Sequence, residues 1–366
     1  MDRREVTFFT EKEIDVEKVI KIIENFSNYK NDEDKKISKK IKNMLKLKDF
    51  SILGSQEIQF LNSNKEEIWT EYLIFRYKFM IYPVEKTVSD FPIYVLIEPV
   101  SACNLRCTMC FQVDETFSGN SEYMGNMDIN LFKKIIDELY EGGTKAITLA
   151  SRGEPTMHAK FGEMLDYCKG KFFEVKMNTN ATRLTDKLIH KILQSGVTDI
   201  VFSVDSYKKE EYESIRIGGI FEQVFNNIKK FTDIKKNEYP NSKCSTRVSG
   251  VKVSESQNSE EFNKFWSKYV DHVVMVTMKH RWDTYHNSTE IMSPNPCSIL
   301  WGRMYVWYDG KCNPCDEDYK SELEVGNVNT KSIKEIWHDQ QYTLLRKLHQ
   351  EGNRKSVFPC DRCANW

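Results

Sequence analysis

Between residues 93 and 290 the sequence alternates between short apolar, β-branched runs and longer amphipathic stretches, and this rhythm limits the fold more than any other feature. The apolar runs predict strands at 93–98, 146–150, 172–178, 199–204, 246–253 and 272–277. The amphipathic stretches predict helices at 130–140, 160–168, 185–194, 221–234 and 259–270. Apolar strands separated by helices are typical of parallel strands that are buried on both faces. We therefore expect an α/β fold, an incomplete (β/α)6 TIM-like barrel whose chemistry lies at the carboxyl ends of its strands.

Two further segments flank the predicted barrel of residues 93–290. Residues 1–92 form an α-rich N-terminal extension, in which Ile37, Ile41 and Leu45 recur at helical spacing, with Met44 beside them. This extension carries no recognisable chemistry. Residues 291–366 are rich in Cys, Trp, Asp and Gly. A segment of this size has little core of its own, so we expect a small C-terminal domain stapled by cysteine-bound metal.

The overall composition excludes several classes of partner. The net charge is −1, which gives no electrostatic reason to expect nucleic acid or an anionic membrane as a partner. The N-terminus has no apolar signal region, and no apolar run approaches the ~20 residues of a membrane-spanning helix. We expect a cytoplasmic protein, where thiols stay reduced. Eight of its ten cysteines fall into two groups, from which only Cys168 and Cys244 stand apart, and these clustered cysteines are predicted to be metal ligands rather than disulfide partners.

The first cysteine group follows the first predicted strand directly. Cys103, Cys107 and Cys110 are separated by three and two residues, so one loop can bring three thiolates to a single iron–sulfur cluster. A structural zinc site usually needs four ligands. Three cysteines with no obvious fourth leave one metal position open, where a substrate or cofactor can bind.

This C-x3-C-x2-C spacing resembles that of the radical S-adenosylmethionine superfamily, and other landmarks of that family follow in order. Arg152-Gly153-Glu154-Pro155 resembles the GGEP motif, which contacts the amino group of the cofactor's methionine part. In the family the end of the fourth strand contacts the ribose, the arginine corresponding to Arg216 pairs with the carboxylate, and the fifth strand packs the adenine. The resemblance thus assigns cofactor binding to Met109, Phe111, Gly153, Glu154, Pro155, Asn178, Ser203, Asp205, Arg216 and Val251.

Two residues depart from the family pattern. Met109 stands where the family usually has an aromatic residue before the third cysteine, with Phe111 just after it. Arg152 replaces the first glycine of GGEP. The resemblance implies an enzyme that binds S-adenosylmethionine at a [4Fe-4S] cluster and cleaves it to a 5′-deoxyadenosyl radical. It also implies an electron donor of the flavodoxin or ferredoxin type.

The second cysteine group consists of Cys297, Cys312, Cys315, Cys360 and Cys363, and two interpretations remain open. Two C-x2-C pairs, formed by the last four of these residues, would make a zinc site. Alternatively, Cys297, Cys315, Cys360 and Cys363 hold an auxiliary [4Fe-4S] cluster. The order Cys297, Gly310, Cys315 resembles the twitch domain, a shortened SPASM domain, and favours the auxiliary cluster. Cys312 is then a spare thiol or a substitute ligand.

The substrate is less well defined by the sequence. Family members with one auxiliary cluster of this kind include dehydrogenases of aminocyclitols and sugars. The resemblance therefore favours oxidation of a sugar-like small molecule, in surface-polysaccharide or nucleotide-sugar biosynthesis. The alternatives are a peptide-modifying maturase or epimerase of the same superfamily and a zinc-stapled binding module without catalysis.

Three residues are candidates for catalysis. His280 and Asp283 follow the sixth predicted strand, so they are expected at the barrel mouth, where either is a candidate base for a hydroxyl proton. Cys244 lies near the start of the fifth strand and is a candidate hydrogen-atom donor in an epimerase.

Overall fold

The computed structural model describes residues 14–278 and 284–364. The chain divides into two compact units, Met1–Ser89 and Asp90–Trp366. Within the described ranges, no helix has the length and apolar character needed to cross a membrane.

The first unit is helical. Its helices are α1 (Val16–Asn25), α2 (Asp32–Lys46), α3 (Ser55–Ser63) and α4 (Trp69–Glu85), with a short 3-10 helix, η1, at Glu66–Ile68. Ile37, Ile41 and Leu45 of α2 are buried, as their spacing predicts. The side chains of Asp15 and Asn31 cap α1 and α2 by accepting hydrogen bonds from the backbone of the first turn.

A buried ion pair joins α3 to α4 within this unit. Arg76 Nε lies 2.6 Å from Glu57 Oε1, and each side chain is only 4% exposed. Lys78 of α4 makes a second connection, to Glu33 and Asp34 of α2. Charged pairs thus connect α4 to both α2 and α3.

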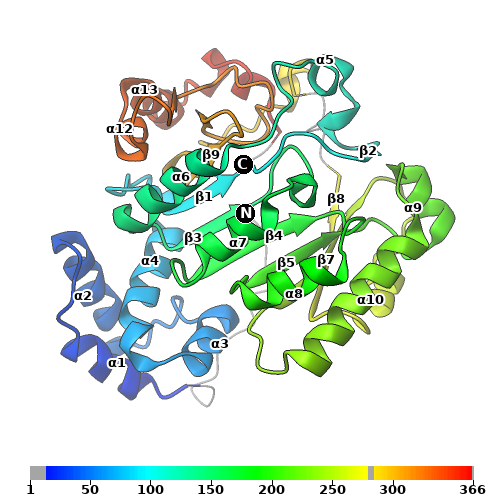
Figure 1. Cartoon of the computed structure of the whole chain (residues 1–366). Helices are drawn as coiled ribbons and strands as arrows, with labels where there is room; N and C mark the ends of the chain where they lie inside the picture. Colours follow the sequence, from blue (N-terminus) through cyan, green and yellow to red (C-terminus); the bar gives the residue numbers. More distant parts are fainter. Residues whose placement is uncertain (1–13, 279–283, 365–366) are drawn as a thin grey trace. The chain divides into compact units, whose positions relative to one another are not determined.

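The second unit is built on one nine-stranded sheet, in the order β11-β10-β9-β1-β3-β4-β5-β7-β8. Six of these strands are parallel and are separated by helices, as the sequence predicts: β1 (Tyr94–Ile97), β3 (Ala146–Leu149), β4 (Glu174–Thr179), β5 (Asp199–Ser203), β7 (Ser245–Lys252) and β8 (His272–Thr277). Figure 1 shows these strands side by side, with α6, α7, α8 and α10 packed along them. The predicted incomplete barrel is confirmed.

The helices of this unit are α5 (Glu115–Ser118), α6 (Ile129–Gly142), α7 (Phe161–Cys168), α8 (Asp186–Gln194), α9 (Lys209–Ile215), α10 (Phe221–Glu238), α11 (Ser259–Trp266), α12 (Ile333–Trp337) and α13 (Gln340–Gln350). On β4, β5 and β7 only one face is fully buried. Met177, Phe202 and Val248 share this face and are fully buried.

The opposite, inner face of the same strands is only half-buried, and it carries Lys176, Asn178, Ser203, Arg247 and Ser249. The expectation that the strands are buried on both faces is therefore wrong for β4, β5 and β7, where polar side chains alternate with apolar ones. It holds for β3, whose four residues are all buried.

The C-terminal part continues the sheet of the barrel. Strand β9 (Arg303–Val306) pairs with β1 in parallel, and β10 (Lys311–Asn313) and β11 (Gly326–Asn327) add antiparallel strands. Trp301, Trp307, Trp337 and Tyr342 are all at most 1% exposed. These side chains are buried in a segment whose sheet is continuous with that of the barrel, so the prediction that the segment has little core of its own stays a prediction.

Candidate functional site

The three cysteines of the first group lie together in the loop that follows β1. Cys107 is 8% exposed and clusters with Leu105, Met109 and Ile215. Further side chains pack against this cluster, from the loop itself and from the ends of β7 and β8: Cys103, Cys110, Val251, Val253 and Met278. The structure thus brings the three cysteines together with Met109 and Val251 at the carboxyl ends of the strands.

A two-stranded ribbon holds the middle of this loop. Strand β2 (Arg106–Cys107) pairs with β6 (Arg216–Ile217), so Cys107 lies opposite Arg216. Arg216 Nη1 points at Cys107 Sγ, 3.7 Å away, and Arg216 Nε lies 2.7 Å from Asp205 Oδ2. Asp205 also accepts a hydrogen bond from the backbone N–H of Val251. Asp205 therefore fastens Arg216 to the strand ends, and the contacts of both residues with ribose or carboxylate stay predictions.

The loop after β3 contains Gly153, Glu154 and Pro155, and it lies against the backbone just before Cys103. A Cβ atom on Gly153 would stand 2.3 Å from the carbonyl oxygen of Val100, so only glycine fits there. Glu154 N–H donates to the carbonyl oxygen of Ala102. The loop and the cysteines therefore move as one piece.

The carboxylate of Glu154 is buried and makes hydrogen bonds that hold this loop in place. It accepts hydrogen bonds from Thr179 Oγ1 and from the backbone N–H of Asn180, each at 2.7 Å. Burial raises the pKa of Glu154, and these donors oppose that rise. Glu154 thus joins the ends of β3 and β4, while its contact with a cofactor amino group stays a prediction.

The surroundings of the three thiols fit an iron–sulfur cluster. Burial raises the pKa of Cys103 to about 12 and that of Cys107 to about 11, so both thiols are neutral at pH 7 without a cation. N–H groups nevertheless point at the sulfurs: Leu105 N and Asn180 Nδ2 lie 3.5 and 3.8 Å from Cys103 Sγ. Such donors stabilise thiolates once iron displaces their protons.

Four cysteines of the second group line one cavity in the C-terminal part. The cavity has a volume of about 360 Å³ including its open mouth, and its lining contains Cys297, Cys315, Cys360 and Cys363. Burial raises the pKa of Cys297 to about 12 and also raises those of Cys315 and Cys360. Cys312 lies outside the lining, fully buried on β10 with its Sγ against Gly310 O. The geometry therefore favours the ligand set with Cys297 over the zinc set with Cys312.

Arg354 fixes the two C-terminal ligands of this cavity. Its guanidinium donates to the carbonyl oxygens of Cys360, Cys363 and Asn295 at 3.0 to 3.1 Å, and the residue is 3% exposed. Nothing in the local sequence marks Arg354, because it binds carbonyl groups six and nine residues downstream and 59 residues upstream.

Comparison with known families decides the identity of these two sites. Residues 97–256 match the radical SAM superfamily, and residues 297–364 match the SPASM iron–sulfur cluster-binding domain. The chain belongs to the radical SAM superfamily. Its cofactors are accordingly S-adenosylmethionine, the [4Fe-4S] cluster that binds it, and auxiliary iron–sulfur chemistry in the SPASM domain.

Several relatives resemble parts of this radical SAM protein. It is 36% identical over 113 residues to a tungsten-containing aldehyde ferredoxin oxidoreductase cofactor-modifying protein of Pyrococcus furiosus, which covers 31% of this chain and 30% of that protein. It is 30% identical over 311 residues to the subtilosin biosynthesis protein AlbA of Bacillus subtilis, covering 74% and 65% of the two chains. It is 23% identical over 282 residues to an S-adenosyl-L-methionine-dependent 2-deoxy-scyllo-inosamine dehydrogenase of Niallia circulans, covering 74% and 91%.

Solved structures support the fold. The structure of Streptococcus suis SuiB bound to its precursor peptide SuiA aligns with a TM-score of 0.54 at 15% identity, covering 90% of this chain and 84% of that one. The chain spans less than two thirds of the length of the P. furiosus and B. subtilis relatives. Substrate and partners therefore have to be argued from the site itself.

Two predicted site residues lie outside the cluster of Cys107. Phe111 packs its ring on Tyr319 and Phe117, in a cluster that Cys110 also contacts, and its part in cofactor binding stays a prediction. Cys244 is 2% exposed and directly precedes the amino end of β7, whereas the cysteine loop lies at the carboxyl ends of the strands. A thiol there is a small core side chain, so the proposal of Cys244 as a hydrogen-atom donor is withdrawn.

The positions of the remaining predicted residues neither support nor exclude their predicted roles. His280 and Asp283 lie outside the described residues, and their roles stay predictions. Asn178 and Ser203 lie on the inner face of the sheet, where β4 and β5 end. Pro155 begins the short 3-10 helix η3 (Pro155–Met157).

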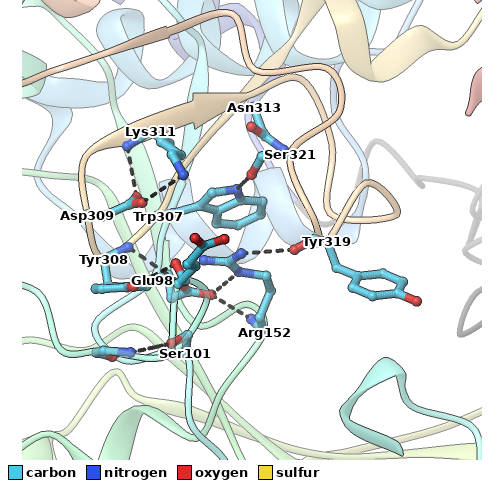
Figure 2. A network of polar contacts seen from close by, with 12 residues as sticks. Glu98, Ser101, Arg152, Trp307, Tyr308, Asp309, Lys311, Asn313, Tyr319 and Ser321 are labelled. Atoms are coloured by element: carbon cyan, nitrogen blue, oxygen red, sulfur yellow. Dashed lines mark hydrogen bonds and ion pairs between the residues drawn. The ribbon is translucent and has the colours of Figure 1, made fainter. Parts of the chain in front are cut away.

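The sequence analysis missed a buried network around Arg152 (Figure 2). The guanidinium of Arg152 is 2% exposed and pairs with the fully buried Glu98 at the end of β1. Two signals were present in the sequence: a glutamate at the end of an apolar strand, and an arginine where the family has glycine. Together they indicate that each charge compensates the other.

Proposed function

We propose that this radical SAM enzyme oxidises an alcohol carbon of a sugar-like small molecule to a ketone. The observation that carries the proposal is the polar inner face of the sheet. Lys176, Asn178 and Arg247 line this face, followed by Ser203 and Ser249 toward the carboxyl ends of the strands. A polyhydroxylated substrate needs such donors and acceptors, because each of its hydroxyl groups loses hydrogen bonds to water on binding and must make new ones with the protein.

The polar lining leads toward the cysteine loop. Ser249 and Val251 share the inner face of β7, and Val251 packs against the cluster that contains the three cysteines. A substrate held by the lining would therefore lie beside the site of radical formation. When bound, the cofactors supply a radical that removes one hydrogen atom and an acceptor for one electron. The hydroxyl proton then has to leave to a base, and His280 and Asp283 remain the candidates.

Comparison with relatives adds support of two kinds. The dehydrogenase of N. circulans, which is named for an aminocyclitol substrate, aligns over 91% of its own length. The four cysteines in the C-terminal cavity suffice for one fully ligated auxiliary cluster, which suits an electron acceptor rather than a substrate-binding site.

A second candidate function is peptide modification. The relative AlbA, named for its part in subtilosin biosynthesis, aligns over 74% of this chain at 30% identity. We rank this candidate lower because the support comes from similarity alone.

The test is an anaerobic incubation of the reconstituted enzyme with S-adenosylmethionine, a strong reductant and panels of aminocyclitols, nucleotide sugars and leader-containing peptides. We expect one small polyol to lose two hydrogens, with one 5′-deoxyadenosine formed per product. Mass spectrometry measures both products. Modification of a peptide with no turnover of any polyol would reject the proposal in favour of the second candidate. A flavodoxin or ferredoxin is the electron donor we propose for the cell.

A further inference from the structure

The network around Arg152 connects the two cysteine sites through one side chain. Arg152 Nε and Nη2 donate to the two oxygens of Glu98 at 2.7 and 2.6 Å, and Nη1 donates to the carbonyl oxygen of Tyr319 at 2.9 Å. Figure 2 shows the guanidinium between Glu98 and the segment that carries Tyr319. A two-pronged bond to a carboxylate fixes the plane as well as the position of an arginine.

Two aromatic rings lie near the same guanidinium. The centre of the Trp307 ring lies 4.3 Å from its carbon, and that of Phe117 lies 5.4 Å away. The Trp307 indole N–H donates to Ser321 Oγ. Trp307 and Ser321 belong to the C-terminal part, whereas Phe117 follows the cysteine loop, so Arg152 has an aromatic neighbour from each.

The backbone of Arg152 is tied to the radical SAM site on its other side. Gln112, two residues after Cys110, donates one side-chain N–H to the carbonyl oxygen of Arg152 at 2.6 Å and another bond to that of Ser101 at 2.8 Å. The next residue, Gly153, has no room for a Cβ, and Glu154 follows it. A displacement of Arg152 therefore also displaces Glu154 and the cysteine loop, because hydrogen bonds and close packing connect these segments directly.

The same side chain reaches the auxiliary cavity in one further step. Asp318, the neighbour of Tyr319, lines the cavity that contains Cys315. Its buried carboxylate accepts hydrogen bonds from Tyr285 OH and from the backbone N–H groups of Glu322 and Leu323. The hydrogen bonds of Asp318 thus hold the loop that presents Tyr319 O to Arg152, at the point where this loop lines the cavity.

We infer that Arg152 is a positioning residue that couples the two sites, so that S-adenosylmethionine binds tightly only when the auxiliary site is properly formed. A buried ion pair seldom adds net stability over an apolar pair of the same shape. The arrangement around Arg152 instead specifies one orientation of the Gly153–Pro155 loop relative to Tyr319. This inference deepens the proposed function and rests on the radical SAM site, but not on the identity of the substrate.

The test measures binding of S-adenosylmethionine without any substrate. The double variant E98L/R152M replaces both charges by apolar side chains of similar length, which keeps the fold because no buried charge is left alone. We expect its affinity for S-adenosylmethionine, measured by anaerobic equilibrium dialysis, to fall at least about fivefold. The iron content should stay that of the wild type. Wild-type affinity in this variant would overturn the inference.

A matched control is available in the first unit. Glu57 and Arg76 form an equally buried pair, and neither belongs to the radical SAM or SPASM segment. The variant E57L/R76M should bind S-adenosylmethionine as the wild type does. If E98L/R152M does not fold, R152K takes its place. A lysine keeps the positive charge but cannot make the two-pronged hydrogen bond to Glu98, so R152K should still weaken binding of S-adenosylmethionine. Unchanged affinity in R152K would equally overturn the inference.

A thermodynamic cycle separates coupling from a merely structural role. Cys360→Ala, which removes one auxiliary ligand, should weaken S-adenosylmethionine binding in the wild type and should have a much smaller effect in E98L/R152M. An equal effect in both backgrounds would show that Arg152 carries no coupling. Because no substrate is present, a failed search for a sugar substrate leaves this result unaffected.

Discussion

The two cysteine sites of this radical SAM enzyme are assembled in opposite ways. Cys103, Cys107 and Cys110 come from one loop of eight residues, held by the short pairing of Cys107 with Arg216. The four cysteines that we predict as auxiliary ligands come from three separate stretches, around Cys297, Cys315 and the pair Cys360–Cys363. The first site is local in sequence, so it can exist before iron binds. The second is a product of tertiary folding, and we expect its metal to contribute to that folding.

The largest expected effect is the loss of iron when a cysteine that ligates a cluster is replaced. Cys107→Ala should abolish formation of 5′-deoxyadenosine and lower the iron content from about eight to about four per chain, since each cysteine group holds one cubane. Cys315→Ala should lower iron by the same amount. The matched control is Cys312→Ala, which should keep about eight irons because its thiol lies outside the cavity. Loss of iron in that control would restore Cys312 as a ligand and break the comparison.

Iron removal should affect the two sites unequally. Chelation should lower the free energy of unfolding of the C-terminal part by about 3 kcal/mol or more, because the cluster binds only the folded form. Hydrogen exchange should then speed up in α12 and α13, while β4 and β5 of the barrel keep their protection. Equal protection of both regions after chelation would show that the auxiliary site is preformed as well.

Arg354 offers a smaller and more local test. Arg354→Met leaves three carbonyl oxygens without their donor, two of them on cluster ligands, and should cost about 3 kcal/mol of stability. Arg346→Met is the control, since Arg346 also binds buried carbonyl groups, those of Leu300 and Trp337, but no cysteine. Denaturant unfolding measures both losses. Only Arg354→Met should change the electron paramagnetic resonance spectrum of the auxiliary cluster.

The smallest effect concerns a contact between the two sites. Burial alone would raise the pKa of Asp114, but hydrogen bonds from Lys320, Thr116 and Tyr319 outweigh it and lower that pKa to about 2. A lowered carboxyl pKa stabilises the fold above the unfolded value of about 3.9, and this contribution is lost as the pH falls toward 2.

The variant Asp114→Asn measures this contribution. It should lose about 1 kcal/mol at pH 7. The difference in stability from the wild type should disappear between about pH 4 and pH 2, as followed by unfolding titrations at each pH. A difference that persists unchanged at pH 2 would mean that the side chain acts by packing rather than by charge.

Much of the fold follows from local patterns in the sequence. The β-branched runs became β1, β3, β4, β5, β7 and β8, because strand and helix periodicities differ and each segment shows one of them. The loop from Cys103 to Cys110 could be located for the same reason: its spacing is a local property. The alternation of polar residues in β4 was also visible, but the strand was interpreted as buried on both faces.

Tertiary structure alone decided the rest. The sequence left both Cys297 and Cys312 as possible auxiliary ligands, and only the folded chain turns Cys312 into the core and Cys297 into the cavity. It placed Cys244 within reach of a substrate, because position in the chain does not tell which way a side chain turns. Nor did it connect Glu98 with Arg152, 54 residues apart. The type of each element depends on neighbours along the chain, whereas ligand sets and buried charge pairs depend on distances that only packing defines.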